Sequence, residues 1–347
     1  MSLKVGIVGV PNVGKSTLFN ALTNNSVPSE NFPFCTIDPN VGIVFVNDER
    51  LYQINEIVCS DTIVNADITF VDIAGLIKGS ASGEGLGNKF LSHIYDIDLI
   101  LEVVREFNDE NIIHVENSID SNRDIEIIKT ELILKDLETL KKLKENSFKE
   151  SRKNPSYLED INIFNKLEEI LDRGDLIFDQ EFSISDSNIL KKYNFLTNKK
   201  FIYLYNSDEY KPHIDKDSIY MNILFEYELS KMNKEDQELF LKDFSIDESG
   251  ISLLTKFAFD KIGLQVFFTA GEKEVKAWVI KKGTNSADAS AVIHTDFKKN
   301  FIKMEVVSFE DFIKFKGWNN AKDNGALRIV GADYILNDGD IVIVRHS

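Results

Sequence analysis

The stretch KVGIVGVPNVGKST, residues 4–17, decides the fold of this chain, because it predicts a strand, a tight loop and the start of a helix. Val5, Ile7 and Val8 form a nearly continuous apolar run, as expected of a strand buried on both faces. Residues 9–16 then fit the pattern G-x-x-x-x-G-K-[ST] of a phosphate-binding loop. A glycine turn with an incidental lysine is the alternative. The flanking strand and helix, in the required order, favour a P-loop in an α/β domain.

Each residue type in this loop suits contact with a triphosphate. Gly9 and Gly14 let the backbone curl, so that its N–H groups converge on phosphate oxygens. The helix that begins near Lys15 directs its positive end toward the same anion. Lys15 supplies a mobile cation for the β- and γ-phosphates, and Ser16 supplies a hydroxyl ligand for Mg²⁺.

Two further segments follow in the order that P-loop switch proteins use. Thr36 lies in a loop with two prolines, where its hydroxyl would complete the Mg²⁺ site and its N–H would meet the γ-phosphate; an ordinary surface loop is the alternative. Asp72 ends a predicted strand and begins a D-x-x-G element. Its carboxylate would hold Mg²⁺ through water, and the N–H of Gly75 would detect the γ-phosphate.

The residue after this glycine departs from the usual catalytic pattern. Ras-like GTPases place a water-orienting glutamine there, whereas this chain has Leu76, which cannot orient a nucleophilic water. We therefore expect a slow enzyme, or one in which another group supplies the hydrogen bond. His93 and His114 are the nearby polar candidates, and we favour His114 as catalytic, with a structural or surface role as the alternative for both.

Periodicity outlines the rest of the first domain. Strands are predicted over residues 41–46, 66–71 and 99–105, and the period becomes helical from Asn122. A polar break at residues 146–154 precedes a second helix, which predicts an antiparallel helical hairpin inserted into the α/β domain. The hairpin is either a docking arm for a partner or a plain solvated element.

The strand over residues 200–205 ends at Asn206-Ser207-Asp208-Glu209, where GTPases carry N-K-x-D. In that motif the aspartate accepts two hydrogen bonds from guanine. Ser207 and Glu209 replace the lysine and the aspartate, and each guanine donor left unpaired would cost about 1–3 kcal/mol. Adenine, which lacks these donors, is therefore the better candidate, unless the segment is only a turn at the end of a strand.

The last segment, from about Leu264, is predicted to be a separate compact module. Short strands are expected over residues 265–269, 275–280, 301–307 and 341–344, with helices over 286–293 and 309–315. Strands and helices mixed within about 80 residues favour a β-grasp fold. Its lysines form either an RNA-facing patch or ordinary solvated surface; they are Lys281, Lys282, Lys298, Lys299, Lys303, Lys314, Lys316 and Lys322.

Composition limits the class of protein. The chain has 347 residues, enough for about two or three domains, and no apolar run of the ~20 residues that would span a membrane. Cys35 and Cys59 cannot form a disulfide framework, which fits a reducing cytoplasm. The net charge of −17 argues against general nucleic-acid binding, so any RNA contact must use a local patch or a protein surface. We expect no sequence-specific DNA partner.

Over nearly its whole length the chain resembles the YchF/Obg-like ATPase family of P-loop proteins. The matching stretches are GIVGVPNVGKSTLFNALT from Gly6, NFPFCTIDPN from Asn31, FVDIAGLIKGSASGEGLGNKFL from Phe70, NIIHV from Asn111, the N-x-x-E at Asn206, FFTAGEKEVKAW from Phe267, IHTDF from Ile293 and SFEDF from Ser308. The resemblance implies a G domain, an inserted coiled-coil arm and a C-terminal TGS domain of β-grasp type. It also implies a preference for ATP, hydrolysis without the usual glutamine, and association with the ribosome.

The resemblance further implies roles for single residues. The phosphates would be held by Asn12, Val13, Gly14, Lys15, Ser16 and Thr17, the Mg²⁺ by Ser16 and Thr36, and the base by Asn206, Ser207 and Glu209. An asparagine at position 12 can coordinate K⁺ in related enzymes, so K⁺ joins Mg²⁺ as an expected cofactor. The base pocket departs from the family at Asn222 and Ile223, which replace small residues, and at Ser207 and Asp208, where Val and Asn are common.

We therefore expect a monomeric, cytoplasmic, Mg²⁺-dependent ATPase whose nucleotide state switches a ribosome-linked surface, without a membrane partner. The predicted G domain comprises residues 1–122 and 197–263, the helical hairpin residues 123–196, and the TGS domain residues 264–347. An Obg-type GTPase is the close alternative. A nucleotide-gated binding protein, in which hydrolysis is incidental, is the alternative from another class.

Overall fold

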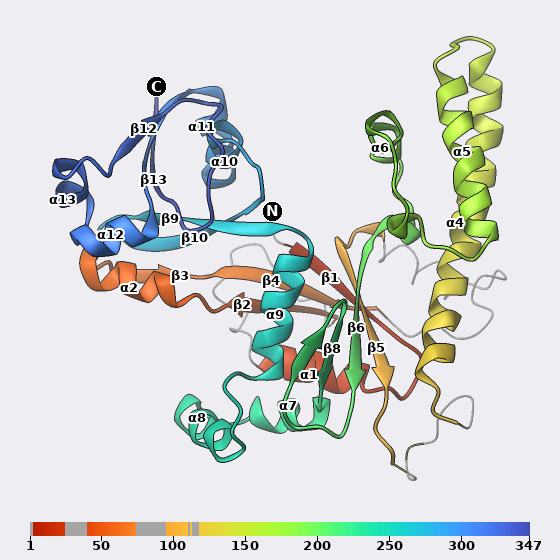
Figure 1. Ribbon diagram of the computed structural model, residues 1–347, viewed down its shortest axis with the longest axis horizontal. Coiled ribbons are helices and arrows are strands. Elements are labelled where there is room, and N and C mark those ends of the chain that lie inside the picture. The colour runs from red at the N-terminus through yellow and green to blue at the C-terminus, as the bar shows by residue number, and fades with distance from the viewer. Residues whose placement is uncertain (1–2, 25–39, 74–94, 110–111, 113–117) are drawn as a thin grey trace.

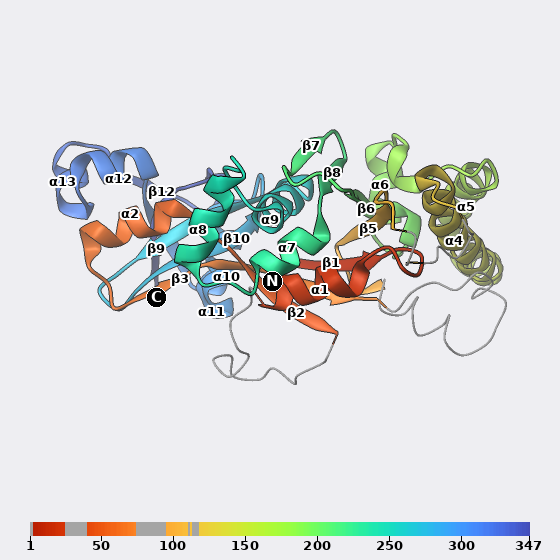
Figure 2. The ribbon, with the colours of Figure 1, turned by 90° about the horizontal axis from the view of Figure 1, so that it is seen from below.

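The computed structural model describes residues 3–24, 40–73, 95–109, 112 and 118–347. These residues form two β-sheets and an arm of two long helices (Figure 1). Seen from below, the second sheet and its helices lie at one end of the long axis, the first sheet in the middle, and the arm at the other end (Figure 2). No helix within the described ranges has both the length and the apolar composition needed to cross a bilayer.

The first sheet has seven strands in the order β2-β4-β1-β5-β6-β8-β7. Its five central strands are parallel, and the edge strands β2 and β7 run antiparallel to their neighbours. Register places Ile7 beside Asp72 and Arg105 beside Asn206, so the ends of four strands meet at one edge. The strands are β1 (Leu3–Val8), β2 (Val41–Val46), β4 (Ala66–Asp72), β5 (Leu99–Arg105), β6 (Lys200–Asn206), β7 (His213–Asp215) and β8 (Ser218–Met221).

Helices that pack on this sheet begin where a polar side chain caps them. Asn222 caps the helix after β8 by accepting the N–H of Phe225, and Ser249 caps the next buried helix by accepting the N–H of Ser252. Leu18 and Leu22 of the first helix are fully buried in the same core as the central strands. These helices are α1 (Lys15–Asn24), α7 (Ile223–Leu229), α8 (Lys234–Asp243) and α9 (Gly250–Lys261).

The arm consists of α4 (Ser121–Ser151) and α5 (Tyr157–Asp172), which lie side by side (Figure 1). Three short helices then return the chain to β6: η3 (Ile177–Asp179), α6 (Ile184–Leu190) and η4 (Leu196–Asn198). Buried Asp136 of α4 accepts the backbone N–H groups of Leu196 and Thr197, so the returning chain is anchored on the arm. The helices α4 and α5 thus occupy residues for which two successive helices were predicted.

The predicted end of the first arm helix is wrong. The polar break was expected from Asn146, but α4 continues to Ser151. Lys149 and Glu150, which lie within the predicted break, are polar residues with good helix propensity, so a polar composition here does not end the helix.

The second sheet has six strands in the order β12-β11-β13-β9-β10-β3. Its strands are β3 (Thr62–Val64), β9 (Leu264–Ala270), β10 (Glu274–Lys281), β11 (Phe301–Val307), β12 (Arg328–Val330) and β13 (Ile341–His346). Its helices are α2 (Glu49–Val58), α10 (Ser286–Ile293), α11 (Thr295–Lys299), α12 (Phe309–Phe315) and α13 (Trp318–Asp323). The four strands and two helices predicted after residue 264 are therefore confirmed, with β12, α11 and α13 in addition.

One segment joins the two sheets. The strand β3 pairs in parallel with β10, with Ile63 beside Val275, although these two residues are 212 positions apart in sequence. Leu51 and Ile54 of α2 are fully buried in one hydrophobic cluster with Phe268. The predicted division placed residues 1–122 in the first domain, whereas residues 49–64 pack with the sheet of the C-terminal part.

Candidate functional site

The loop between β1 and α1 has the backbone that a phosphate cradle requires. Gly9 and Gly14 have φ angles of +149° and +106°, and Asn12 has a φ of +64°. A Cβ atom on Gly9 would lie 2.5 Å from the carbonyl oxygen of Val103, and one on Gly14 would lie 2.7 Å from Nδ2 of Asn206. Both glycines are therefore required by dihedral angle and by space.

Lys15 lies at the start of α1 with its side chain folded back into this loop. Its Nζ donates hydrogen bonds to the carbonyl oxygens of Gly9 and Val10, both at 2.8 Å. Burial lowers the pKa of Lys15 to about 8, and the negative charge of Asp72 opposes that change. Burial also raises the pKa of Asp72, and the charge of Lys15 opposes it, so the two groups lie within electrostatic reach of each other.

Asn206, at the end of β6, joins three parts of the site. Its Nδ2 donates to the carbonyl oxygen of Val13 at 3.0 Å, and its Oδ1 accepts the N–H of Ile223 at 3.1 Å. Its own carbonyl oxygen accepts the N–H groups of Glu106 and Phe107, at 2.9 and 3.0 Å. The side chain is buried, so these bonds are shielded from water. Asn206 therefore fixes the P-loop, the start of α7 and the segment after β5 relative to one another.

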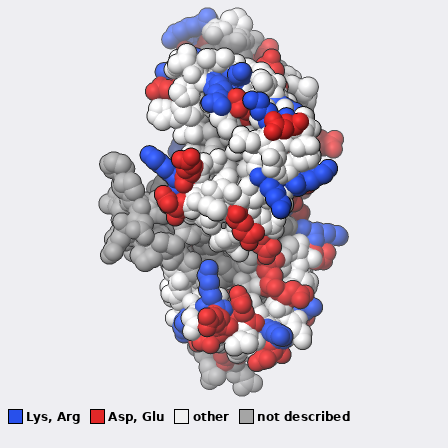
Figure 3. Space-filling view, turned by 90° about the vertical axis from the view of Figure 1, so that its left-hand side faces the viewer, with Lys and Arg blue, Asp and Glu red and all other residues white. Residues whose placement is uncertain are grey.

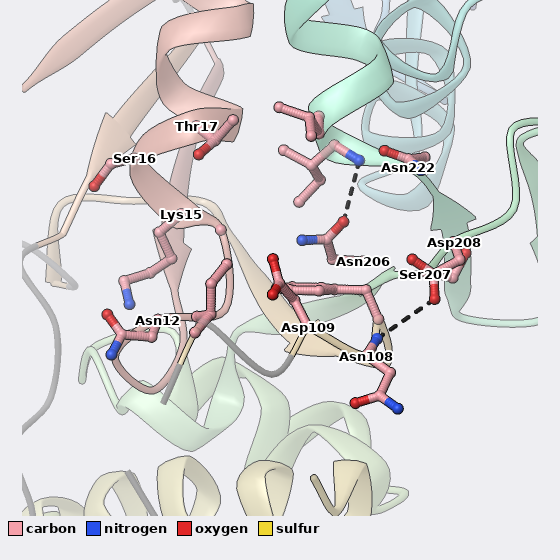
Figure 4. A pocket seen from close by; sticks show the side chains of 15 residues that line it. Asn12, Lys15, Ser16, Thr17, Asn108, Asp109, Asn206, Ser207, Asp208 and Asn222 are labelled. Carbon is pink, nitrogen blue, oxygen red and sulfur yellow. Dashed lines mark hydrogen bonds between the residues drawn. The ribbon is translucent and has the colours of Figure 1, made fainter. Parts of the chain in front are cut away.

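A cavity of about 590 Å³ opens between these elements (Figure 4), a volume within the usual range for small-molecule sites. Figure 4 shows Asn12, Lys15, Ser16 and Thr17 on one side, and Asn108, Asp109, Ser207 and Asp208 on the other. The lining residues are Asn12, Gly14, Lys15, Ser16, Thr17, Phe107, Asn108, Asp109, Ile112, Asn206, Ser207, Asp208, Asn222, Ile223 and Leu224.

Comparison with known proteins identifies the family. The chain is 40% identical over 365 residues to the ribosome-binding ATPase YchF of Bacillus subtilis (strain 168), and the match covers 100% of both chains. It is likewise 40% identical over 362 residues to the protein of the same name from Haemophilus ducreyi, again over 100% of both. The chain belongs to the YchF family.

Structure and family models agree with this membership. The solved structure of the Schizosaccharomyces pombe YchF GTPase matches with a TM-score of 0.87 and 35% identity, over 99% of this chain and 98% of that one. Residues 264–347 match the family model YchF-GTPase_C, described as "Protein of unknown function (DUF933)", and residues 4–139 match MMR_HSR1, described as "50S ribosome-binding GTPase". The resemblance inferred from the motifs is confirmed, and so is the P-loop α/β fold.

Most of the predicted residues that the structure describes lie together. Seven line the cavity: Asn12, Gly14, Lys15, Ser16, Thr17, Asn206 and Ser207. Val13 is fully buried and contributes its carbonyl oxygen to the bond with Asn206. Asp72 lies at the end of β4 beside Ile7 of β1. Thr36, Gly75 and His114 lie outside the described residues, as do Cys35, Leu76 and His93, so their roles stay predictions.

Glu209 is the described residue that departs most from its expected place in a YchF base pocket. It is absent from the cavity lining, and its side chain is 69% exposed, 3.8 Å from Nδ1 of His213. Its backbone N–H donates to Oγ of Ser207 at 3.4 Å, so it remains part of the turn after β6. Its contact with the base stays a prediction.

The cavity wall formed by Phe107, Asn108, Asp109 and Ile112 was missed by the sequence analysis. No motif identifies it, but its position after β5 gives a usable signal. Ligands of α/β sheets bind at the carboxyl ends of the strands, and β5 lies between β1 and β6, which bear the P-loop and Asn206. Residues that follow β5 are therefore expected at the site.

The described residues fit a magnesium ion, although they form no preassembled metal cluster. No group of three or more His, Cys, Asp or Glu residues within the described part of the chain could hold a metal. A P-loop site needs fewer protein ligands, because the phosphates supply the rest. Ser16 is exposed on the cavity and Asp72 lies within electrostatic reach of Lys15, so a hydroxyl and a carboxylate, both hard oxygen donors, are available.

Proposed function

We propose that this chain binds and hydrolyses ATP with Mg²⁺, and that the nucleotide switches a surface that contacts the ribosome. The observation that carries the proposal is the hydrogen bond from Nδ2 of Asn206 to the carbonyl oxygen of Val13 in the P-loop. This bond joins the phosphate-binding loop to the C-terminal end of β6, which is where P-loop proteins bind the base. The names of the curated relatives, ribosome-binding ATPases, support the reaction and the partner.

In the proposed reaction this chain binds, orients and neutralises the triphosphate. The N–H groups of residues 12–17 surround the phosphates, and Lys15 leaves the carbonyls of Gly9 and Val10 to contact the β- and γ-phosphates. Ser16 and Thr36 would hold Mg²⁺ directly and Asp72 through water. The ion, when bound, supplies positive charge that stabilises the transferring phosphoryl group.

Turnover is proposed to be slow in the isolated protein. Leu76 stands where a glutamine would orient the attacking water. Thr36 and Gly75 are the candidates for γ-phosphate sensing, and His114, favoured over His93, is the candidate for water orientation. Asn12 lines the cavity and carries an amide oxygen suited to K⁺, which would add charge at the phosphates. A ribosome or K⁺ is therefore proposed to raise the rate.

GTP hydrolysis is a second candidate, and one observation favours it. The preference for adenine was argued largely from Glu209, whose side chain lies outside the cavity lining. The Schizosaccharomyces pombe relative is named a GTPase. Against it, no lysine follows Asn206: Ser207 lines the cavity there, so the stem that covers guanine in N-K-x-D proteins has no counterpart.

The partner surface is proposed to combine the arm, as a coiled coil, with a C-terminal β-grasp TGS domain. The face shown in Figure 3 has positive and negative groups side by side in its upper half and mainly negative groups in its lower half. Several lysines are paired, for example Lys282 with Asp260 at 2.6 Å. Because positive and negative groups are mixed on this face, we propose that the ribosome is contacted through individual side chains and not through a continuous basic patch. We further propose a monomer located in the cytoplasm.

Calorimetry with the purified protein tests the nucleotide assignment. MgATP should bind more tightly than MgGTP, and hydrolysis should increase when ribosomes or K⁺ in place of Na⁺ are added. Tighter binding of MgGTP would instead establish the second candidate. Failure to bind either nucleotide would refute the assignment of the site.

A further inference from the structure

Arg105, the last residue of β5, lies beneath the cavity wall that follows it. Its side chain is buried, with 1% of the residue exposed. It donates hydrogen bonds to three backbone carbonyl oxygens: Nε to Phe107 at 3.2 Å, Nη2 to Asp109 at 3.1 Å and Nη1 to Ile112 at 2.9 Å. The guanidinium also lies 4.3 Å from the centre of the Phe107 ring.

These contacts fix the backbone at three described positions after β5, which are Phe107, Asp109 and Ile112. A planar guanidinium presents its donors in fixed directions, so the three carbonyl groups must converge on one plane. Each of these three residues lines the cavity. A buried cation is costly unless its donors are satisfied, and here backbone carbonyls and an aromatic face satisfy them. The wall can therefore move only by exposing or unpairing this charge.

The other edge of the wall is held by β6 and the turn after it. The carbonyl oxygen of Asn206 accepts the N–H of Phe107, and the carboxylate of Asp208 accepts the N–H of Asn108 at 3.4 Å, as Figure 4 shows. Arg105 supplies the matching contacts on the carbonyl side of the same segment. Without Arg105, the wall would keep the hydrogen bonds of its N–H groups but would lose the three hydrogen bonds of its carbonyl groups.

We propose that Arg105 is a positioning residue for the nucleoside half of the nucleotide. It acts through Phe107, Asp109 and Ile112, which line the side of the cavity opposite the P-loop. Arg105 itself would not touch the phosphates. This inference rests on the proposed function, because it assigns a nucleotide to the cavity. It makes affinity for the base and ribose depend on Arg105, and affinity for the polyphosphate independent of it.

Binding of three probes to Arg105→Met tests the proposal. Affinity for ATP and for ADP should fall by the same factor, about tenfold or more for three lost charge-assisted hydrogen bonds, whereas affinity for inorganic tripolyphosphate should stay within about twofold. In the ATPase assay, KM should rise by a larger factor than kcat falls. Arg105→Lys keeps the positive charge but loses the planar guanidinium, so its affinity for ATP and ADP should lie between those of wild type and Arg105→Met.

Arg50→Met is the matched control. Arg50 is likewise an arginine in a hydrogen-bonded network, 5.1 Å from the centre of the Phe268 ring, but it is only partly buried and lies at the second sheet. This variant should destabilise the protein without changing affinity for any of the three probes.

Two results would overturn the inference. The first is unchanged ATP affinity in both Arg105 variants. The second is an equal loss for ATP and tripolyphosphate, which would show general collapse of the site. If Arg105→Met does not fold, the comparison of ATP with tripolyphosphate in Arg105→Lys decides the question. A wild-type protein that binds tripolyphosphate but neither ATP nor ADP would refute the proposed function itself.

Discussion

Two arginines hold two regions of this molecule together in opposite ways. At the nucleotide edge, Arg105 is buried, and its side chain donates to three backbone carbonyls and packs against one aromatic ring. At the junction of the sheets, Arg50 is partly exposed and bonds two carboxylates, Asp48 and Asp338. The first arrangement fixes the path of one loop, and the second links two segments far apart in sequence.

The difference teaches what each region is sensitive to. Bonds to carbonyl groups depend on backbone geometry, so changes at the nucleotide edge should alter ligand binding. Asp338 accepts both Nη1 of Arg50, at 2.7 Å, and the N–H of Val266, at 2.9 Å. Changes at the junction should therefore alter stability while binding is preserved.

The largest effect is expected at Gly14. Alanine would require a φ of +106° and would place its Cβ 2.7 Å from Nδ2 of Asn206, so the P-loop must distort. Nucleotide affinity should fall about 100-fold or more, as measured by calorimetry with MgATP. Gly174 also has a positive φ, +79°, but no atom lies within 4 Å of an added Cβ. Gly174→Ala should leave affinity unchanged, and an equal loss in both variants would contradict the explanation.

Glu102, buried within β5, should make stability depend on pH. Burial raises its pKa well above the ordinary value, and the charges of Asp124 and Glu126 add to the rise. Because the folded state then retains a proton that the unfolded state has lost, wild-type stability falls as pH rises from the unfolded pKa toward the folded one. Glu102→Gln has the same shape without the charge. Its stability relative to wild type should grow by up to about 1.4 kcal/mol per pH unit in that window.

Melting temperatures of Glu102→Gln and wild type from about pH 5 to about pH 8 measure this difference. Glu145→Gln, an exposed change on α4, controls for the loss of one charge. A difference between Glu102→Gln and wild type that is constant across the range would refute the prediction.

Asp338 at the junction should give a smaller effect. Asparagine keeps an acceptor for Val266 but loses the charge that faces Arg50. Because the Asp338 side chain is 50% exposed, the cost should be about 0.5–1 kcal/mol, measured as a lower melting temperature with unchanged MgATP affinity. Asp333→Asn, an exposed change in the same C-terminal region, is the control. Weaker MgATP binding in Asp338→Asn would show that the two regions are coupled.

The smallest effect is expected within the arm, away from both regions. Lys144 of α4 and Glu168 of α5 form an ion pair at 2.6 Å, with side chains 26% and 46% exposed. Lys144→Met should cost about 0.5 kcal/mol or less, because exposed pairs are weak. The exposed Lys142→Met is the control, and melting at low and high salt measures both variants. A loss of stability in Lys144→Met larger than that in Asp338→Asn would contradict the expected ranking of the two effects.

The sequence predicted elements whose burial is regular. The strands β2, β5 and β11 begin and end where expected, because apolar runs bounded by polar residues specify them. The strand β3 has three residues, and its partner β10 lies 212 positions further along the chain, so no local pattern predicts the pairing. For the site, the P-loop and Asn206 follow from motifs. The Arg105 contacts depend on backbone geometry that periodicity does not encode.

The pairing of β3 with β10 limits how the C-terminal part can be exchanged during evolution. The chain passes between the two sheets three times: from β2 into α2, from β3 into β4, and from α9 into β9. A recombination event that exchanged residues 264–347 for an unrelated module would leave β3 without a neighbour and would uncover Leu51 and Ile54. The C-terminal part and the β2–β4 connection are therefore expected to evolve as one unit.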